Sequence, residues 1–135
     1  MTNDIIKTNI LIIDDNPIHL KLLTKILFEK GYGVRIAPSA KLGINSIMAE
    51  APDLILLDIK MSDMDGYTVC QQLKANVKTC DIPVIFISAL EDVMDKVKAF
   101  KMGGADYIVK PFATQEVMAR IENQLQIIKK IKRFG

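Results

Sequence analysis

The segment Leu54–Leu57 constrains the fold most strongly, because four apolar residues run directly into a carboxylate, Asp58. An apolar run without alternation predicts a strand buried on both faces, as in a parallel sheet covered by helices. A charge at the carboxyl end of such a strand lies where open α/β sheets build their sites. Asp58 could instead only cap the next turn. This segment alone favours neither interpretation.

Composition limits the class of protein. The 135 residues fit one domain, and with half of them hydrophobic and a quarter charged they predict a folded globular chain. A net charge of +2 gives no argument for a nucleic-acid or membrane partner. There is no signal peptide or bilayer-spanning run, and Cys70 and Cys80 lack metal-site spacing. We therefore expect a cytoplasmic protein with reduced cysteines and no membrane insertion.

Apolar segments alternate with segments of helical periodicity along the whole chain. Strands are predicted at about 9–13, 34–37, 54–57, 82–87 and 105–109, and helices at about 17–30, 39–50, 66–76, 92–102 and from 114 onward. This alternation predicts an α/β fold with a parallel, doubly wound sheet and right-handed crossovers. The pattern does not determine the order of the strands.

The spacing of apolar residues predicts which helix faces contact the sheet. The inward residues are expected to be Ile18, Leu22, Leu23, Ile26 and Leu27, then Leu42, Ile44, Ile47 and Met48, then Val69, Cys70 and Leu73, and then Val93, Val97 and Phe100. In the last helix, Met118, Ile121, Leu125 and Ile128 either pack on the sheet ahead of a frayed end or begin a coiled coil. Tyr32 is interpreted as a packing residue, and His19 as a surface histidine.

Four strand ends carry polar side chains, namely Asp14-Asp15, Asp58, Ser88 and Lys110. The ends of parallel strands share one edge, where three carboxylates would repel one another unless a cation intervened. Mg²⁺ fits, because it needs few protein ligands. A carboxylate can also accept a phosphoryl group, whose oxygens Lys110 and Ser88 could then contact. Each residue alone has an ordinary explanation as a cap, strand-end hydroxyl or solvated lysine, but the combination is more specific.

The order and spacing of these landmarks resemble the receiver (CheY-like) domains of two-component response regulators. The matching segments are Ile12–Asn16, Leu56–Asp58, Met64–Gly66, Ile87–Ala89, Gly104–Tyr107 and Val109–Phe112. The resemblance implies a flavodoxin-like (βα)5 three-layer sandwich with strand order 2-1-3-4-5. It also implies a receiver domain over 9–125, a flexible segment 1–8, and an extension 126–135 that is a candidate linker to an output domain or partner.

The resemblance further implies roles at the metal and phosphoryl site. Asp58 would be the phosphoacceptor. Asp15 and Asp58 would bind Mg²⁺ through their side chains, Lys60 through its backbone carbonyl, and Asp14 through water.

A conformational switch is implied by the same resemblance. Ser88 would be the switch hydroxyl, Lys110 the phosphate contact preceding a cis peptide bond to Pro111, and Tyr107 the aromatic switch residue. Phosphorylation would remodel the face formed by the fourth helix, the fifth strand and the fifth helix. Such a switch works only through contacts that differ between its two states.

The implied partners are a sensor histidine kinase or phosphotransfer protein and a downstream output domain or protein. A homodimer could form through the remodelled face or through the last helix, and no direct contact with nucleic acid is expected. The only expected chemistry is Mg²⁺-dependent self-phosphorylation and autodephosphorylation, so the chain is not expected to be an enzyme.

Two departures from the family pattern stand out. Met61-Ser62 replaces a frequent Met-Pro, which is expected to remove a turn constraint without affecting the chemistry. Lys60 and Leu90 occupy positions that in the family tune hydrolysis of the phosphate, and a long cation and an apolar side chain there predict slow autodephosphorylation.

Three alternatives stay open from the sequence. A haloacid-dehalogenase-like phosphatase resembles the chain but would have a second Asp where Lys60 stands, and it would need a cap domain. A flavodoxin-like electron carrier would need a hydroxyl-rich loop in place of Asp14–Pro17. A receiver-like protein that only binds partners is disfavoured by the intact acidic and lysine positions.

Overall fold

The computed structural model describes residues 7–89 and 93–134, and over these residues five parallel strands alternate with five helices. The strands are β1 (Asn9–Ile13), β2 (Gly33–Ala37), β3 (Leu54–Asp58), β4 (Val84–Ser88) and β5 (Asp106–Val109). The helices are α1 (Pro17–Glu29), α2 (Ala40–Ala49), α3 (Gly66–Lys74), α4 (Val93–Lys101) and α5 (Thr114–Phe134). The sheet order β2-β1-β3-β4-β5 confirms the predicted doubly wound fold.

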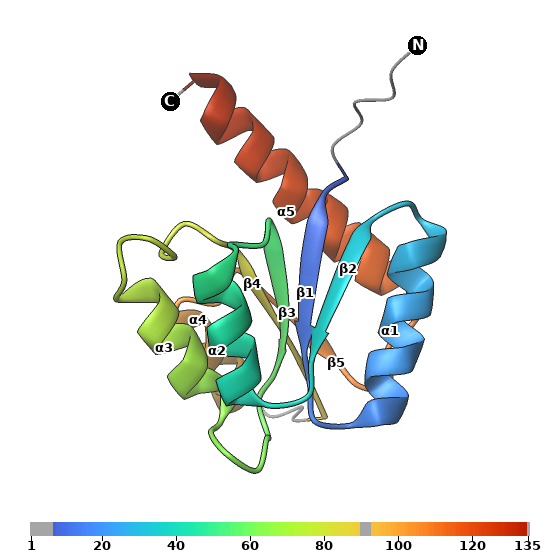
Figure 1. The fold of residues 1–135 in the computed structure, drawn as a ribbon, viewed down its shortest axis with the longest axis vertical. Helices are drawn as coiled ribbons and strands as arrows, with labels where there is room; N and C mark the ends of the chain where they lie inside the picture. Colours follow the sequence, from blue (N-terminus) through green and yellow to red (C-terminus); the bar gives the residue numbers. More distant parts are fainter. Residues whose placement is uncertain (1–6, 90–92, 135) are drawn as a thin grey trace.

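Helices cover both faces of the sheet, as Figure 1 shows. The apolar residues of α1 and α5 pack with one set of strand side chains, among them Ile12 and Leu56. Those of α2, α3 and α4 pack with the opposite set, among them Leu57 and Phe86. Every residue of β3 and β4 is buried, because each of these central strands has helices on both sides.

The strand register brings the carboxyl ends together. Ile13 pairs with Leu57, Asp58 with Ile87, and Ser88 with Val109. The residues that follow Ile13 and Val109 therefore emerge beside Asp58 and Ser88. This alignment creates the polar edge that the sequence predicted.

Local sequence signals explain several helix ends. The Asn16 side chain accepts a hydrogen bond from the Ile18 N–H at 2.9 Å, and Pro17 is the first residue of α1. The Asp65 carboxylate accepts from the Thr68 N–H at 2.8 Å and caps α3. Gly31 follows α1 with a φ of +88°, a conformation that glycine adopts without a Cβ penalty. The ends of these helices therefore form for local reasons.

The predicted inward faces of α1 and α2 were partly wrong. Ile18 and Leu22 are exposed, as are Leu42 and Met48. Helix α2 approaches the sheet so closely that a Cβ on Gly43 would lie 2.5 Å from the Ile13 side chain. Ala40, Gly43 and the predicted Ile47 therefore face the sheet, whereas Leu42 and Met48 lie on exposed sides of the helix.

The predicted apolar stripe of α4 was also wrong. Val93 is 70% exposed and Phe100 50%, and Val97 is exposed as well. Ala99 is the buried contact of this helix within the described residues. Asp92, the predicted first residue of this helix, lies outside the described residues.

Helix α5 packs on the sheet through its first half, since Met118 and Ile121 are buried and Leu125 packs against the same cluster. The helix then continues past the sheet (Figure 1), where Ile127 and Ile131 are exposed. A coiled coil through this extension stays a prediction. No helix among the described residues has the length and apolar character needed to span a membrane.

Most of the segment expected to be flexible, residues 1–6 of 1–8, lies outside the described residues. Within the described part, the Thr8 carbonyl accepts a hydrogen bond from the Gly33 N–H at 2.9 Å. Thr8 is therefore tied to the start of β2.

Candidate functional site

Three carboxylates converge where β1 and β3 end. Asp14 and Asp58 are buried, with exposed fractions of 1% and 7%, and Asp15 is exposed. One oxygen from each of the three lies within 4.8 Å of the others. This is a compact set of hard oxygen donors, open to solvent through Asp15.

Asp14 is held in place by neighbours on both sides. Its backbone N–H donates to the Ala37 carbonyl at 3.2 Å, which ties it to the end of β2. Its Oδ1 accepts from the Asn16 N–H at 2.9 Å, and Asn16 caps α1. The carboxylate is thus oriented by the same turn that starts the helix.

The loop between β3 and α3 is fastened at several points. The Gly66 N–H donates to the Ile59 carbonyl at 2.7 Å. The Asp63 carboxylate accepts from the N–H groups of Lys41 and Ala40, at 2.9 and 3.1 Å, at the start of α2. The bond from Lys41 contributes most to lowering the pKa of Asp63.

Ser62 has a role that the sequence did not reveal. Its backbone N–H donates to Oδ2 of Asp15 at 3.2 Å. Proline has no N–H and could not make this bond. The expectation that Ser62 leaves the site chemistry unaffected is therefore incomplete, because the residue gives Asp15 a hydrogen-bond donor.

Lys110 lies between the two buried carboxylates. Its ammonium is 3.1 Å from Oδ2 of Asp14 and 3.5 Å from Oδ1 of Asp58. Its backbone N–H donates to the Ser88 carbonyl at 2.8 Å, and its peptide bond to Pro111 is cis. The predicted lysine, serine and carboxylates are therefore neighbours.

Burial and charge repulsion together raise the pKa of Asp58 to about 6. Burial is the largest cause, the charge of Asp14 adds to it, and Lys110 opposes both. A divalent cation among these oxygens would relieve the repulsion between the carboxylates. The donor set and its electrostatics fit Mg²⁺.

Tyr107 is buried beside Ser88. Its exposed fraction is 6%, and its ring centroid lies 6.4 Å from that of Phe86. Burial raises the pKa of Tyr107, and a side-chain hydrogen bond with Ser88 opposes that rise. The predicted hydroxyl and aromatic residues are thus in direct contact.

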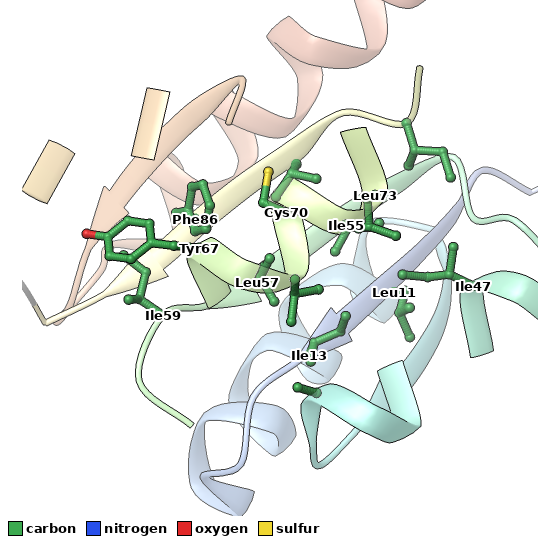
Figure 2. Packing of buried hydrophobic residues seen from close by; sticks show 14 of the residues in the cluster. Leu11, Ile13, Ile47, Ile55, Leu57, Ile59, Tyr67, Cys70, Leu73 and Phe86 are labelled. Carbon is green, nitrogen blue, oxygen red and sulfur yellow. The ribbon is translucent and has the colours of Figure 1, made fainter. Parts of the chain in front are cut away.

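Tyr67 extends the aromatic packing and was missed by the sequence analysis. Figure 2 shows its ring beside Phe86, and the two centroids are 5.7 Å apart. The Tyr67 hydroxyl donates to the Asp95 carbonyl at 3.1 Å, and the Lys98 ammonium lies 4.6 Å from the ring centroid. Burial raises the pKa of Tyr67 to about 12. Tyr67 therefore connects the start of α3 to α4.

His19 is a third residue whose place the sequence did not reveal. Its Nδ1 is 3.0 Å from the Lys110 ammonium and 3.6 Å from Oδ2 of Asp14. The expected surface histidine is therefore a partly exposed neighbour of the site. Its position in the first turn of α1, which starts at this edge of the sheet, was the available signal.

The contacts described above do not test the predicted roles of Lys60 and Leu90. Lys60 lies in the loop after Asp58 with an exposed side chain, and the metal-binding role of its carbonyl stays a prediction. Leu90 lies outside the described residues.

A surface groove of about 660 Å³ lies away from the acidic cluster. Its lining includes Thr8, Asp53 and Pro83, which precede β1, β3 and β4, together with Glu122 and Leu125 of α5. The groove is therefore at the amino ends of the strands, opposite the candidate site.

Comparison with known proteins gives a consistent result. Residues 10–122 match the model of a family described as the response regulator receiver domain. The chain is 40% identical over 117 residues to the DNA-binding dual master transcriptional regulator RpaA from Synechocystis sp., covering 87% of this chain and 48% of that protein. The chain thus spans about half the length of this curated relative.

Solved structures agree in fold. A CheY-like response regulator receiver domain protein from Methanospirillum hungatei superposes with a TM-score of 0.87 and 28% identity, covering 93% of this chain and 98% of the other. The BeF3-activated N-terminal receiver domain of RstA from Klebsiella pneumoniae superposes with a TM-score of 0.81 and 28% identity. The match covers 87% of this chain and 97% of that domain.

Proposed function

The chain belongs to the response regulator receiver domain family, and from this membership we propose that it is a phosphorylation-dependent switch of a two-component phosphorelay. Receiver domains of this family are regulatory modules, not enzymes in the usual sense. The proposed event is transfer of a phosphoryl group from a histidine kinase or phosphotransfer protein to Asp58. The observation that supports this most is the placement of the Asp58 carboxylate beside both an acidic cluster and the Lys110 ammonium.

The proposed cation is Mg²⁺, held by the side chains of Asp15 and Asp58 and the backbone carbonyl of Lys60, with Asp14 acting through water. The convergence of three carboxylates within 4.8 Å supports an ion with oxygen ligands. When bound, the ion would neutralise charge on the phosphoryl oxygens and on the carboxylates.

The residues of the chain have separate proposed tasks. An Asp58 oxygen attacks phosphorus, the bond from phosphorus to the donor's leaving group breaks, and the acyl phosphate forms. The Lys110 ammonium, already 3.5 Å from Asp58, contacts a phosphoryl oxygen. The Ser88 hydroxyl donates to another oxygen, and Tyr107, which contacts Ser88, transmits the change toward α4, β5 and α5.

Downstream partners follow from the family and its relatives. The proposed output is a further domain or separate protein that contacts the changed face, and a homodimer through this face or α5 is a second possibility. Residues 9–125 are the proposed receiver unit and 126–135 the proposed linker.

The test is incubation with Mg²⁺ and acetyl phosphate, followed by mass spectrometry to locate the modified residue. A single base-labile adduct on Asp58, absent from Asp58→Asn, is expected. A folded protein that forms no adduct and binds no Mg²⁺ would overturn the proposal and indicate a receiver fold that acts by phosphorylation-independent binding.

A further inference from the structure

His19 lies in the first turn of α1 and contacts the side chain of Lys110. The distance from its Nδ1 to the Lys110 ammonium is 3.0 Å, slightly shorter than the 3.1 Å from that ammonium to Asp14. The His19 side chain is 30% exposed and that of Lys110 11%. The histidine is therefore the more exposed partner of this contact.

The chemistry of the two groups fixes the direction of this hydrogen bond. An ammonium group has three N–H donors and no acceptor, so Nδ1 of His19 must be the acceptor. The imidazole consequently carries its proton on Nε2 in this arrangement. Three groups then surround the ammonium within 3.5 Å, namely His19, Asp14 and Asp58.

Hydrogen bonds at the start of α1 fix the backbone that carries His19. The Asn16 side chain accepts from the Ile18 N–H at 2.9 Å and is 3.4 Å from the His19 N–H. The Asn16 N–H in turn donates to Asp14. The turn that orients Asp14 thus also fixes the backbone position of His19 next to the site.

We propose that His19 is a positioning residue for Lys110, holding the ammonium between Asp14 and Asp58 by accepting one of its N–H groups. The inference rests on the proposed phosphoryl transfer to Asp58. A lysine side chain has many rotamers, and a site in which the ammonium is already placed loses less conformational entropy when a phosphoryl group arrives. A neutral acceptor can do this without adding another negative charge beside the carboxylates.

The first test compares phosphorylation rates of Asp58 by acetyl phosphate in the full chain with Mg²⁺. His19→Leu removes the acceptor, and we expect a rate about three- to tenfold lower, the scale of one hydrogen bond. His19→Asn retains an acceptor near the position of Nδ1 and should recover most of the rate. Lys25→Gln, an exposed change further along α1, is the control and should leave the rate unchanged.

A double-mutant cycle separates positioning from a general structural effect. In a Lys110→Ala background, His19→Leu should have no further effect on the rate, because the group it positions is gone. Equal effects of His19→Leu in both backgrounds, or no recovery with His19→Asn, would overturn the proposal.

Nuclear magnetic resonance provides a readout that needs neither Mg²⁺ nor phosphorylation. Long-range proton–nitrogen correlations should show the His19 ring with its proton on Nε2, and Lys110→Ala should shift the Nδ1 resonance. A ring protonated on Nδ1 alone, or an Nδ1 resonance insensitive to Lys110→Ala, contradicts the contact. If the wild type forms no adduct but the resonance behaves as expected, the proposed phosphorylation fails while the positioning contact stands.

Discussion

A Cβ atom on Gly66 would overlap the backbone carbonyl oxygen of Asp58. The start of α3 therefore packs directly against the backbone of the proposed phosphoacceptor. The Gly66 N–H also donates a hydrogen bond to the Ile59 carbonyl there. Gly66→Ala should destabilise the fold by about 1–3 kcal/mol, as other overpacked sites do. Urea unfolding measures this loss.

Gly33→Ala is the matched control for Gly66→Ala. A Cβ on Gly33 would meet its nearest atom, on Asn9, at an ordinary 3.5 Å. Its free energy of unfolding should change by less than about 0.5 kcal/mol. Equal losses in the two variants would contradict the close approach of Gly66 to Asp58.

Asp58→Asn should stabilise the metal-free protein at neutral pH. The Asp58 carboxyl has a pKa of about 6 in the fold, against a reference of 3.8, so the folded state binds more protons between these values. The favourable contribution of the Asp58 carboxyl to the free energy of unfolding is fully present below the reference pKa. This contribution is lost as the pH rises through the pKa of the folded state. The variant should therefore gain about 1–2 kcal/mol near pH 7, a figure reduced for partial solvent screening and the lost contact with Lys110.

The gain from Asp58→Asn should shrink as the pH is lowered toward about 4, where the wild-type carboxyl is also neutral. Denaturant unfolding in chelator-containing buffer at both pH values measures the difference. A gain that does not depend on pH would show that removal of the charge is not its cause.

The hydrogen bond from Ser62 to Asp15 should affect the proposed metal site. Ser62→Pro removes the N–H that orients the Asp15 carboxylate, whereas Ser62→Ala keeps it. We expect Mg²⁺ to bind about three- to tenfold more weakly to the proline variant, at the lower end of effects seen for groups that orient metal ligands. Isothermal titration calorimetry should give unchanged affinity for the alanine variant. Weakening in both variants would implicate the side chain instead.

Tyr67→Phe should loosen α4. The variant keeps the ring contact with Phe86 but loses the hydroxyl bond to the Asp95 carbonyl, for a cost of about 1 kcal/mol. Hydrogen exchange should quicken in α4 more than elsewhere. Tyr32→Phe, on the opposite face of the sheet, should leave exchange in α4 unchanged. Unaltered exchange in the Tyr67 variant would show that this bond does not hold α4.

We predict that Lys60 and Leu90 lengthen the lifetime of the proposed phosphate. A long cation and an apolar side chain at these positions should shield the acyl phosphate from water. Lys60→Asn and Leu90→Glu, singly and combined, should shorten the half-life measured after removal of the phosphodonor. Equal half-lives in the wild type and the double variant would refute this hypothesis, provided that each variant is phosphorylated to the same extent.

Much of the site could be predicted because its parts follow strand ends. Asp14, Asp58, Ser88 and Lys110 each come directly after a buried apolar run, and the parallel sheet aligns those ends on one edge. The caps at Asn16 and Asp65 are also local, because capping depends on residues only a few positions apart.

Burial on the helices was less predictable. Val93, Val97 and Phe100 have the spacing of a buried stripe and are nevertheless exposed, whereas Ala99 packs inward. Which side of a helix meets the sheet depends on the distance and angle of packing, as the close approach of Gly43 to Ile13 illustrates. Periodicity specifies a face but not the rotation at which a helix docks.

Local sequence patterns specify the order of the elements, the parallel sheet and the identity of the residues at its polar edge. Only the tertiary structure placed His19 against Lys110 and the Ser62 N–H on Asp15. These pairs are 91 and 47 residues apart, so their contacts depend on how whole elements pack and cannot be inferred from neighbouring residues.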